Sequence, residues 1–189
     1  EVLGDREPPP ALRITGNDWA MHPQGDAMFG ALAEENDVPI RFMGPSTVLS
    51  DAEFAAKITR LPTVEGVTLT LQSVDNARHD AMVGQPGSAA KVKVALENLR
   101  QSKVRVWVNI ILISDALPEL PELLRWLSDQ GFECALHAFF PDTHPDGWAA
   151  ALLPRSEEIR TVLEGLSSDL VDAIEVLVGL PTCAVPTVL

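Results

Sequence analysis

The chain of 189 residues contains no tyrosine and only two cysteines, Cys134 and Cys183. Two cysteines cannot build the multi-disulfide framework of a small secreted domain, so their number fits a reducing compartment. Basic residues are also few, because 14 Lys and Arg stand against 27 Asp and Glu, for a formal net charge of −13. Such a charge repels a phosphate backbone. We therefore expect a cytoplasmic protein without a nucleic-acid partner.

Long hydrophobic runs are absent, since no apolar stretch approaches the roughly 20 residues that a membrane-spanning helix needs. We therefore expect no membrane partner. The hydrophobic fraction of 46% is typical of a globular domain with a sizeable core. Nothing in the middle of the chain resembles a linker, so we expect one domain over residues 11–181. The opening EVLGDREPPP ends in three prolines, which favour an extended conformation, and is interpreted as a connector over residues 1–10. Residues 182–189 are interpreted as a C-terminal extension.

Six stretches rich in Val, Ile and Leu alternate along the chain with five stretches of helical period. This βαβ alternation favours parallel strands, whose C-terminal ends gather at one edge of a sheet. A doubly wound sheet would show a glycine-rich turn after its first strand, where TGNDWAMH has a single Gly. We therefore predict an α/β fold, a partial (β/α) TIM-like barrel of about six parallel strands with its first unit missing. The expected strands are 11–15, 39–44, 67–73, 104–114, 132–140 and 173–180.

Apolar residues at helical spacing predict the connecting helices. Ser50, followed by Glu53 three residues later, is typical of a capping box at the start of the second helix. Gly131 follows the fourth helix, where a left-handed residue is favoured. The expected helices cover 25–35, 50–61, a segment that begins at Ser88, 121–130 and a segment from 154–156 to Leu166.

Polar residues follow two of the expected strands. The loop TGNDW comes after the first strand, and the third strand leads into Ser73, Asp75 and the pair His79–Asp80. Both segments are equally compatible with ordinary turns, in which Gly permits unusual dihedral angles and Asn, Asp or Ser caps the backbone. In that interpretation the second segment is a strand-to-helix loop, and Ser88 caps the helix that follows it.

Together these segments resemble the radical S-adenosylmethionine family, whose core is a partial (β/α) barrel. ITGNDWAMHP stands where that family has a Gly-Gly-Glu-Pro-like strand end followed by His-Pro. LQSVDNARHDAMVGQPGS is similar to the family's fourth strand end, with its serine, its His-Asp pair and its Pro-Gly-Ser step. VRVWVNIILI is similar to the fifth strand. The resemblance covers Leu12 to about Leu166.

The chain departs from the family pattern in two places. The C-x-x-x-C-x-x-C motif that binds the [4Fe–4S] cluster is absent, and two cysteines about fifty positions apart cannot supply three thiolate ligands. We therefore predict no metal site in this chain, and a cluster only where its ligands lie outside it. In addition, Asn17, Asp18 and Trp19 replace the last three residues of the Gly-Gly-Glu-Pro-like motif.

The resemblance implies S-adenosylmethionine as cofactor. It implies that Gly16, Asn17 and Asp18 face the methionyl group, that Ser73 and Asp75 lie near the ribose, and that Asn109 bonds the methionyl carboxylate or ribose. Within the segment FECALHAFFPDTHPDGW, the resemblance places the loop 141–148 where family members meet their substrates. A His inside an apolar strand is also compatible with a core residue, and Cys134 with a small buried apolar side chain. The expected substrate-binding residues are His137, Phe139, Asp142 and His144.

Two functions follow from these observations. The chain is either most of the barrel of a radical S-adenosylmethionine enzyme that acts on a small molecule or peptide, or a cluster-less binding or scaffold module of the same fold. Either one leaves an open barrel edge, so we expect a partner chain or a missing N-terminal segment to cover it. An unrelated barrel hydrolase or aldolase is a third alternative. It is not favoured, because the chain offers neither a nucleophile nor a Schiff-base lysine at the end of an expected strand.

Overall fold

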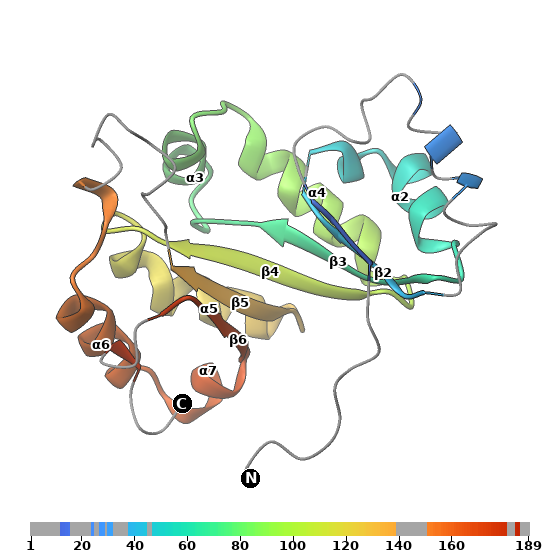
Figure 1. The fold of residues 1–189 in the computed structure, drawn as a ribbon. Coiled ribbons are helices and arrows are strands. Elements are labelled where there is room, and N and C mark those ends of the chain that lie inside the picture. The colour runs from blue at the N-terminus through green and yellow to red at the C-terminus, as the bar shows by residue number, and fades with distance from the viewer. Residues whose placement is uncertain are drawn as a thin grey trace, which may run out of the picture. The chain divides into compact units, whose positions relative to one another are not determined.

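A single parallel sheet is the framework of the fold (Figure 1). The computed structural model describes residues 12–15, 24, 27–28, 30–31, 38–44, 47–138, 151–180 and 184–185. Within them six strands follow one another in the order β1-β2-β3-β4-β5-β6, which confirms the predicted α/β class and the parallel sheet. The strands are β1 Leu12–Thr15, β2 Ile40–Met43, β3 Val64–Thr70, β4 Arg105–Leu112, β5 Glu133–Ala138 and β6 Ile174–Val178.

Helices and short 3-10 turns connect these strands. Two helices were not expected from the sequence, α3 within the segment interpreted as a loop and the short α7 before β6. The described residues of the expected first helix, 27–28 and 30–31, are helical. The other elements are η2 Val48–Ser50, α2 Ala52–Thr59, α3 Asn76–Val83, α4 Ser88–Arg100, η3 Leu117–Glu119, α5 Leu120–Asp129, α6 Ser156–Glu164 and α7 Ser168–Asp172.

Contacts within the chain divide it into two compact units. Unit 1 comprises residues 1–69 and 91–106, and unit 2 comprises residues 70–90 and 107–189. The expected domain limits of 11–181 stay a prediction. None of the described helices combines the length and the apolar character that a membrane crossing requires.

Unit 1 builds its core from alternate strand residues and from apolar helix faces. Ile40 and Phe42 of β2 are fully buried, whereas Arg41 between them is only half-buried, as the alternation of side chains along a strand requires. Asn98 of α4 ties the turn η2 to this core, because its Nδ2 donates to the carbonyl oxygens of Leu49 at 2.9 Å and Ser50 at 3.1 Å.

The start of α2 differs from the sequence prediction. Asp51 is the N-cap, and its carboxylate accepts the N–H groups of Glu53 at 2.9 Å and Phe54 at 3.0 Å. Ser50 was wrongly predicted for this role, because its hydroxyl donates to the Thr47 carbonyl at 2.6 Å and closes the preceding 3-10 turn instead. Ser50 and Asp51 are both residue types that favour the N-cap position. Because the preceding 3-10 turn uses the Ser50 hydroxyl, Asp51 caps α2.

Unit 2 contains the clearest helix of the chain, α5. Its four leucines, Leu120, Leu123, Leu124 and Leu127, are all buried, and the helix contacts β5. Beyond the helix end, Gly131 has φ 75°, so the left-handed residue expected there is present. Cys134 of β5 is fully buried in the same unit, as the sequence predicted.

Leu124 tests this core directly. We expect Leu124→Ala to lower the free energy of unfolding by about 2–5 kcal/mol, because the fully buried side chain leaves a cavity against β5. Urea denaturation followed by circular dichroism measures the change. Ser128→Ala, at an exposed position of the same helix, is the control and should shift stability by less than about 0.5 kcal/mol. Equal losses in both variants would contradict the packing of α5.

Candidate functional site

A side-chain carboxamide holds the segment after β3 against β4. Gln72, which is 3% exposed, donates from Nε2 to the Ile111 carbonyl oxygen at 2.8 Å, and its Oε1 accepts the Ile111 N–H at 2.8 Å. One residue earlier, the Leu71 N–H donates to the Asn109 carbonyl at 3.2 Å. The carboxamide thus continues the pairing with β4 where the strand itself has ended at Thr70.

His79 of α3 fixes the backbone of Gln72. Its Nδ1 accepts the Gln72 N–H at 3.0 Å, and its Nε2 lies 3.4 Å from the hydroxyl of Ser88. A backbone N–H can only donate, so Nδ1 carries no proton and Nε2–H faces Ser88. His79 is 1% exposed and Ser88 is 6% exposed. The histidine of the family-like His-Asp pair is therefore a buried structural residue in this chain.

Asp80, the second residue of that pair, caps the start of α4. Its Oδ2 accepts the Gly87 N–H at 2.5 Å and its Oδ1 accepts the Ala89 N–H at 2.8 Å. The backbone hydrogen bond from Ala89, together with that from Gly87, lowers the pKa of the Asp80 carboxyl. Ser88 was expected to cap this helix, but it is the first helical residue, and the capping carboxylate comes from α3.

Ser73 is fully buried in a polar network. Its hydroxyl donates to Oε2 of Glu119 at 2.8 Å and accepts the Asp75 N–H at 3.0 Å. Arg78 completes the network through an ion pair with Oε1 of Glu119 at 2.9 Å. Sequence reasoning missed Glu119, because an acidic residue in the repeated LPELPEL segment carries no local indication of this long-range contact.

Asp75 is exposed at the start of α3. Its Oδ1 accepts the Arg78 N–H at 2.8 Å, so the residue is the N-cap of the helix. Gly84 closes the same helix in the left-handed conformation, with φ 69°. Of the two residues expected near a ribose, Ser73 thus uses its hydroxyl within the protein, whereas the carboxylate of Asp75 reaches solvent.

Asn109 and His137 belong to one face of the paired strands β4 and β5, as the strand register shows. Asn109 is the direct partner of Ala135, and Ile111 is the direct partner of His137, so alternation places all four side chains on the same face. Both Asn109 and His137 are half-buried. Residues of the opposite face are buried: Val108, Ile110, Leu112, Cys134 and Leu136.

The Oδ1 atom of Asn109 is buried and accepts no hydrogen bond from the residues that the structure describes. A buried acceptor without a donor costs about 1–3 kcal/mol. A hydrogen-bond donor on a bound molecule would remove that cost. Of the candidate residues, Asn109 is therefore the one with a buried acceptor that a ligand could satisfy.

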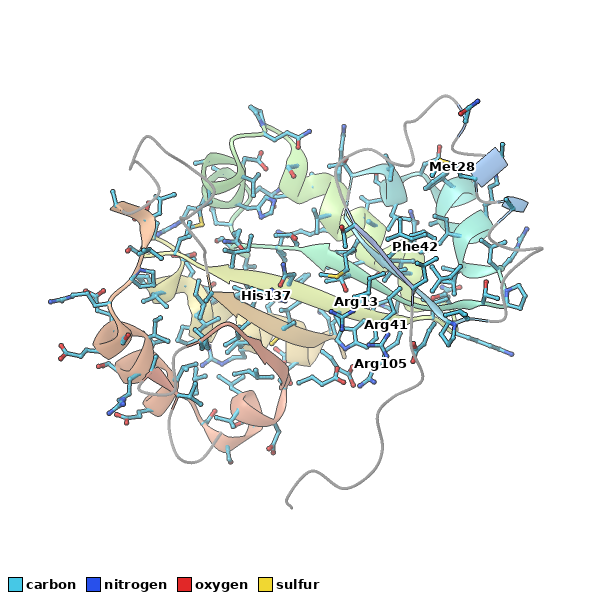
Figure 2. The ribbon with its side chains drawn as sticks, in the orientation of Figure 1. Arg13, Met28, Arg41, Phe42, Arg105 and His137 are labelled. Atoms are coloured by element: carbon cyan, nitrogen blue, oxygen red, sulfur yellow. The ribbon has the colours of Figure 1, made fainter. Side chains whose placement is uncertain are left out.

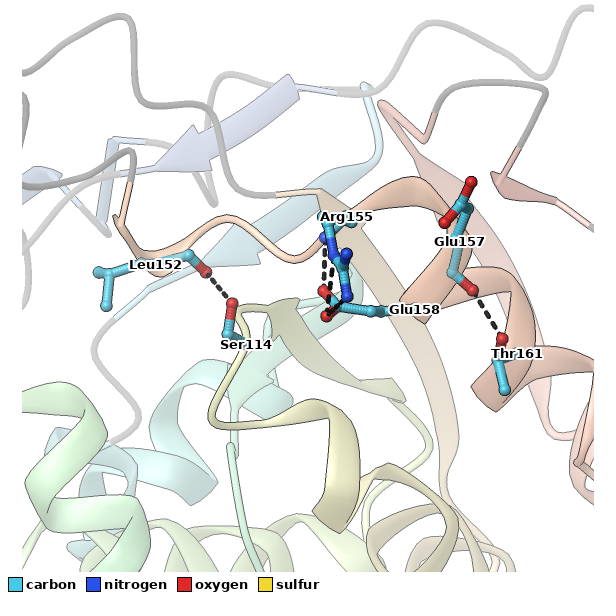
Figure 3. A network of polar contacts seen from close by, with 6 residues as sticks. All are labelled: Ser114, Leu152, Arg155, Glu157, Glu158 and Thr161. Atoms are coloured by element: carbon cyan, nitrogen blue, oxygen red, sulfur yellow. Dashed lines mark hydrogen bonds and ion pairs between the residues drawn. The ribbon is translucent and has the colours of Figure 1, made fainter.

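Beyond the end of β4, the segment before α6 is held by polar contacts (Figure 3). The N–H of Ser114 donates to the Leu152 carbonyl at 2.9 Å, and the Ser114 hydroxyl donates to the same oxygen at 3.2 Å. Arg155 binds Glu158 through Nη2 at 2.8 Å and through its own N–H, also at 2.8 Å. These contacts fix the chain where it returns from the expected substrate segment.

Several predicted site residues lie outside the described part of the chain, and their assignments stay predictions. They are Gly16, Asn17 and Asp18 of the expected methionyl loop, and Phe139, Asp142 and His144 of the expected substrate segment.

Metal-binding residues do not gather in the described part of the chain. Within it no group of three His, Cys, Asp or Glu residues could hold a metal ion. Burial raises the pKa of the Cys134 thiol to about 12, so this cysteine stays protonated at neutral pH. Iron–sulfur clusters are bound by thiolates. Cys134 is therefore unsuited to ligate one.

No protein-family model matches the chain, and the comparison with curated proteins finds no similar sequence. The resemblance to the radical S-adenosylmethionine family therefore rests on the quoted motifs alone and stays a hypothesis.

The capping role of Asp80 predicts a pH dependence of stability. Its folded-state pKa lies below the unfolded value of about 3.9, so its contribution is present above that value and is lost as the pH falls through the folded pKa. We expect Asp80→Asn to be less stable than the wild type at pH 7, with a difference that shrinks below about pH 4. Urea denaturation between pH 7 and acid measures it.

Asp129→Asn is the matched control, because it removes the same charge from an exposed position at the end of α5. A difference between wild type and Asp80→Asn that stays constant through the acid range would contradict the role assigned to the Asp80 carboxylate.

Proposed function

We propose that the chain is most of the barrel of a radical S-adenosylmethionine-type enzyme, which orients that cofactor and a substrate. The observation that carries the proposal is the buried, unsatisfied Oδ1 of Asn109 on the strand face that also holds His137. S-adenosylmethionine carries an ammonium group, ribose hydroxyls and an exocyclic amine, all of which donate hydrogen bonds. When bound and given one electron by a reductant held outside this chain, it would supply a 5′-deoxyadenosyl radical for hydrogen abstraction, with methionine as the leaving group.

The described residues have separate tasks in this proposal. Asn109 accepts a hydrogen bond from the cofactor, and the exposed carboxylate of Asp75 suits a ribose hydroxyl. Ser73 acts on the cofactor site indirectly. Its hydroxyl binds Glu119 and the Asp75 N–H and so positions the start of α3. His137 lies two residues further along the strand face than Ala135, the partner of Asn109, and contacts the substrate.

The proposal also includes the class of substrate and the cellular compartment. A small molecule or a peptide would meet His137 together with Phe139, Asp142 and His144, and the compartment would be the cytoplasm. The barrel form of the parallel sheet, with a first unit missing and a partner covering its open edge, belongs to the same proposal.

The residues of this chain do not fit an iron–sulfur cluster. Two cysteines cannot provide three ligands, and the Cys134 thiol is held in its protonated form. No step is therefore derived through a cluster, and its ligands would have to lie outside these 189 residues.

A second function has its own support. The cluster motif is absent, and Asn17, Asp18 and Trp19 stand in place of the last three residues of the Gly-Gly-Glu-Pro-like motif. A cluster-less module that binds a ligand or scaffolds a partner needs neither feature. It would keep the acceptor of Asn109 for a ligand but would perform no radical chemistry.

Calorimetric titration with S-adenosylmethionine tests the cofactor assignment. We expect Asn109→Ala to weaken binding about tenfold, because it removes the acceptor of one hydrogen bond worth about 0.5–1.5 kcal/mol and more where the donor is charged. Asn109→Asp keeps an acceptor oxygen at the same place and should retain binding. Ser102→Ala is the control, because the Ser102 hydroxyl binds only nearby backbone: it donates to the Leu99 carbonyl and accepts the Val104 N–H.

Ser73→Ala and Asp18→Ala extend the titration to the other assignments and should both weaken binding. No measurable affinity in the wild type, or equal affinity in the wild type and Asn109→Ala, would remove the cofactor from the proposal. Anaerobic incubation of the full-length protein with iron and sulfide then separates the two functions. A brown chromophore favours the enzyme, and cofactor binding without a chromophore favours the module.

A further inference from the structure

The six described strands contain three Lys or Arg residues, and all three lie in unit 1. They are Arg13 in β1, Arg41 in β2 and Arg105 in β4. Each is the first or second residue of its strand, whereas Ser73, Asp75, Asn109 and His137 belong to unit 2. The arginines are thus a separate feature from the candidate site.

The strand register brings two of these arginines side by side. Arg13 and Arg41 are direct Cα partners on neighbouring parallel strands, so their side chains share one face. Figure 2 shows the labelled side chains of Arg13, Arg41 and Arg105 in one region of the sheet. Like charges directly opposite each other in a sheet are destabilising. Glu65 offsets the charge of Arg41, and a bound anion would also offset that of Arg13.

A carboxylate already organises part of the cluster. Glu65 lies at a register shift between β2 and β3, and such bulges re-aim a side chain. Both of its oxygens accept from Arg41, with Nε at 2.8 Å and Nη2 at 3.1 Å. This fork and the nearby positive charge of Arg105 lower the pKa of the Glu65 carboxyl. The arrangement shows that an oxyanion fits against the Arg41 guanidinium.

We propose that Arg13, Arg41 and Arg105 form a binding site for the phosphate group of a small molecule. Arginine is suited to this task, because its planar fork matches phosphate oxygens in pairs. Arg13 and Arg105 are exposed, and 26% of the Arg41 side chain remains accessible beside Glu65. The net charge of −13 repels a polyanion at long range, so the site suits a compact ligand rather than a nucleic acid.

A purely structural network is the competing explanation. In (β/α) barrels, residues at the N-terminal ends of the strands commonly serve stability rather than chemistry. The two explanations differ in a measurable way. A structural network responds to ionic strength alone, whereas a binding site responds to phosphate in a saturable manner and stabilises the fold according to ligand occupancy.

Titration of the protein with inorganic phosphate, with sodium chloride added to hold the ionic strength constant, provides the test. We expect a saturable rise in the unfolding temperature of the wild type. Arg13→Gln should weaken phosphate binding by about tenfold or more, because it removes charge-assisted hydrogen bonds to the phosphate oxygens. Arg60→Gln is the matched control, since it removes the same charge from an exposed position of unit 1, and should leave binding unchanged.

Glu65→Gln separates binding from structure. Removal of the Glu65 charge removes one carboxylate that competes with the ligand for Arg41, so phosphate should bind more tightly even where the variant is less stable. Glycerol 3-phosphate in place of inorganic phosphate distinguishes a phosphate ester from the free ion as the preferred ligand. Absence of a phosphate effect beyond that of chloride, or an equal loss in Arg13→Gln and Arg60→Gln, would overturn the proposal.

Discussion

The carboxamide of Gln72 takes the place of a peptide unit between the end of β3 and β4, with one hydrogen bond in each direction to Ile111. Without it, a buried strand would leave an N–H and a carbonyl unpaired at this point, each at a cost of about 1–3 kcal/mol. After β3 ends at Thr70, this side chain continues the pairing with β4. The path of the chain after Thr70 positions Ser73 and α3.

The His-Asp pair serves two different neighbours from one turn of helix. Successive residues on a helix point about 100° apart, so His79 reaches back to the Gln72 N–H while Asp80 reaches forward to Gly87 and Ala89. Both contacts stabilise the local succession of strand β3, helix α3 and helix α4. The motif therefore explains why the segment folds as it does without reference to a cofactor.

The parts of the fold that could be predicted are those with local causes. The apolar runs located all six described strands, and the leucine spacing located α5, because core burial follows sequence periodicity. The helix α3 was missed because only His79 of its eight residues is buried, so it has no apolar stripe. The contact between Ser73 and Glu119 joins positions 46 residues apart, and neither residue indicates the other in the sequence. Distant polar partners of this kind require the structure.

Asn109 and Ser73 show the same limit within the candidate site. Both were expected near the cofactor on the strength of their polar side chains, yet the structure gives them different chemistry. Ser73 is as buried as a core leucine and has its hydrogen bonds supplied by Glu119 and Asp75, so a ligand would have to displace a protein partner to reach it. Asn109 instead keeps a buried oxygen that no described residue satisfies. A leucine at that position would avoid the cost of the unmet acceptor, and under the proposed function a donor on the bound cofactor removes that cost instead.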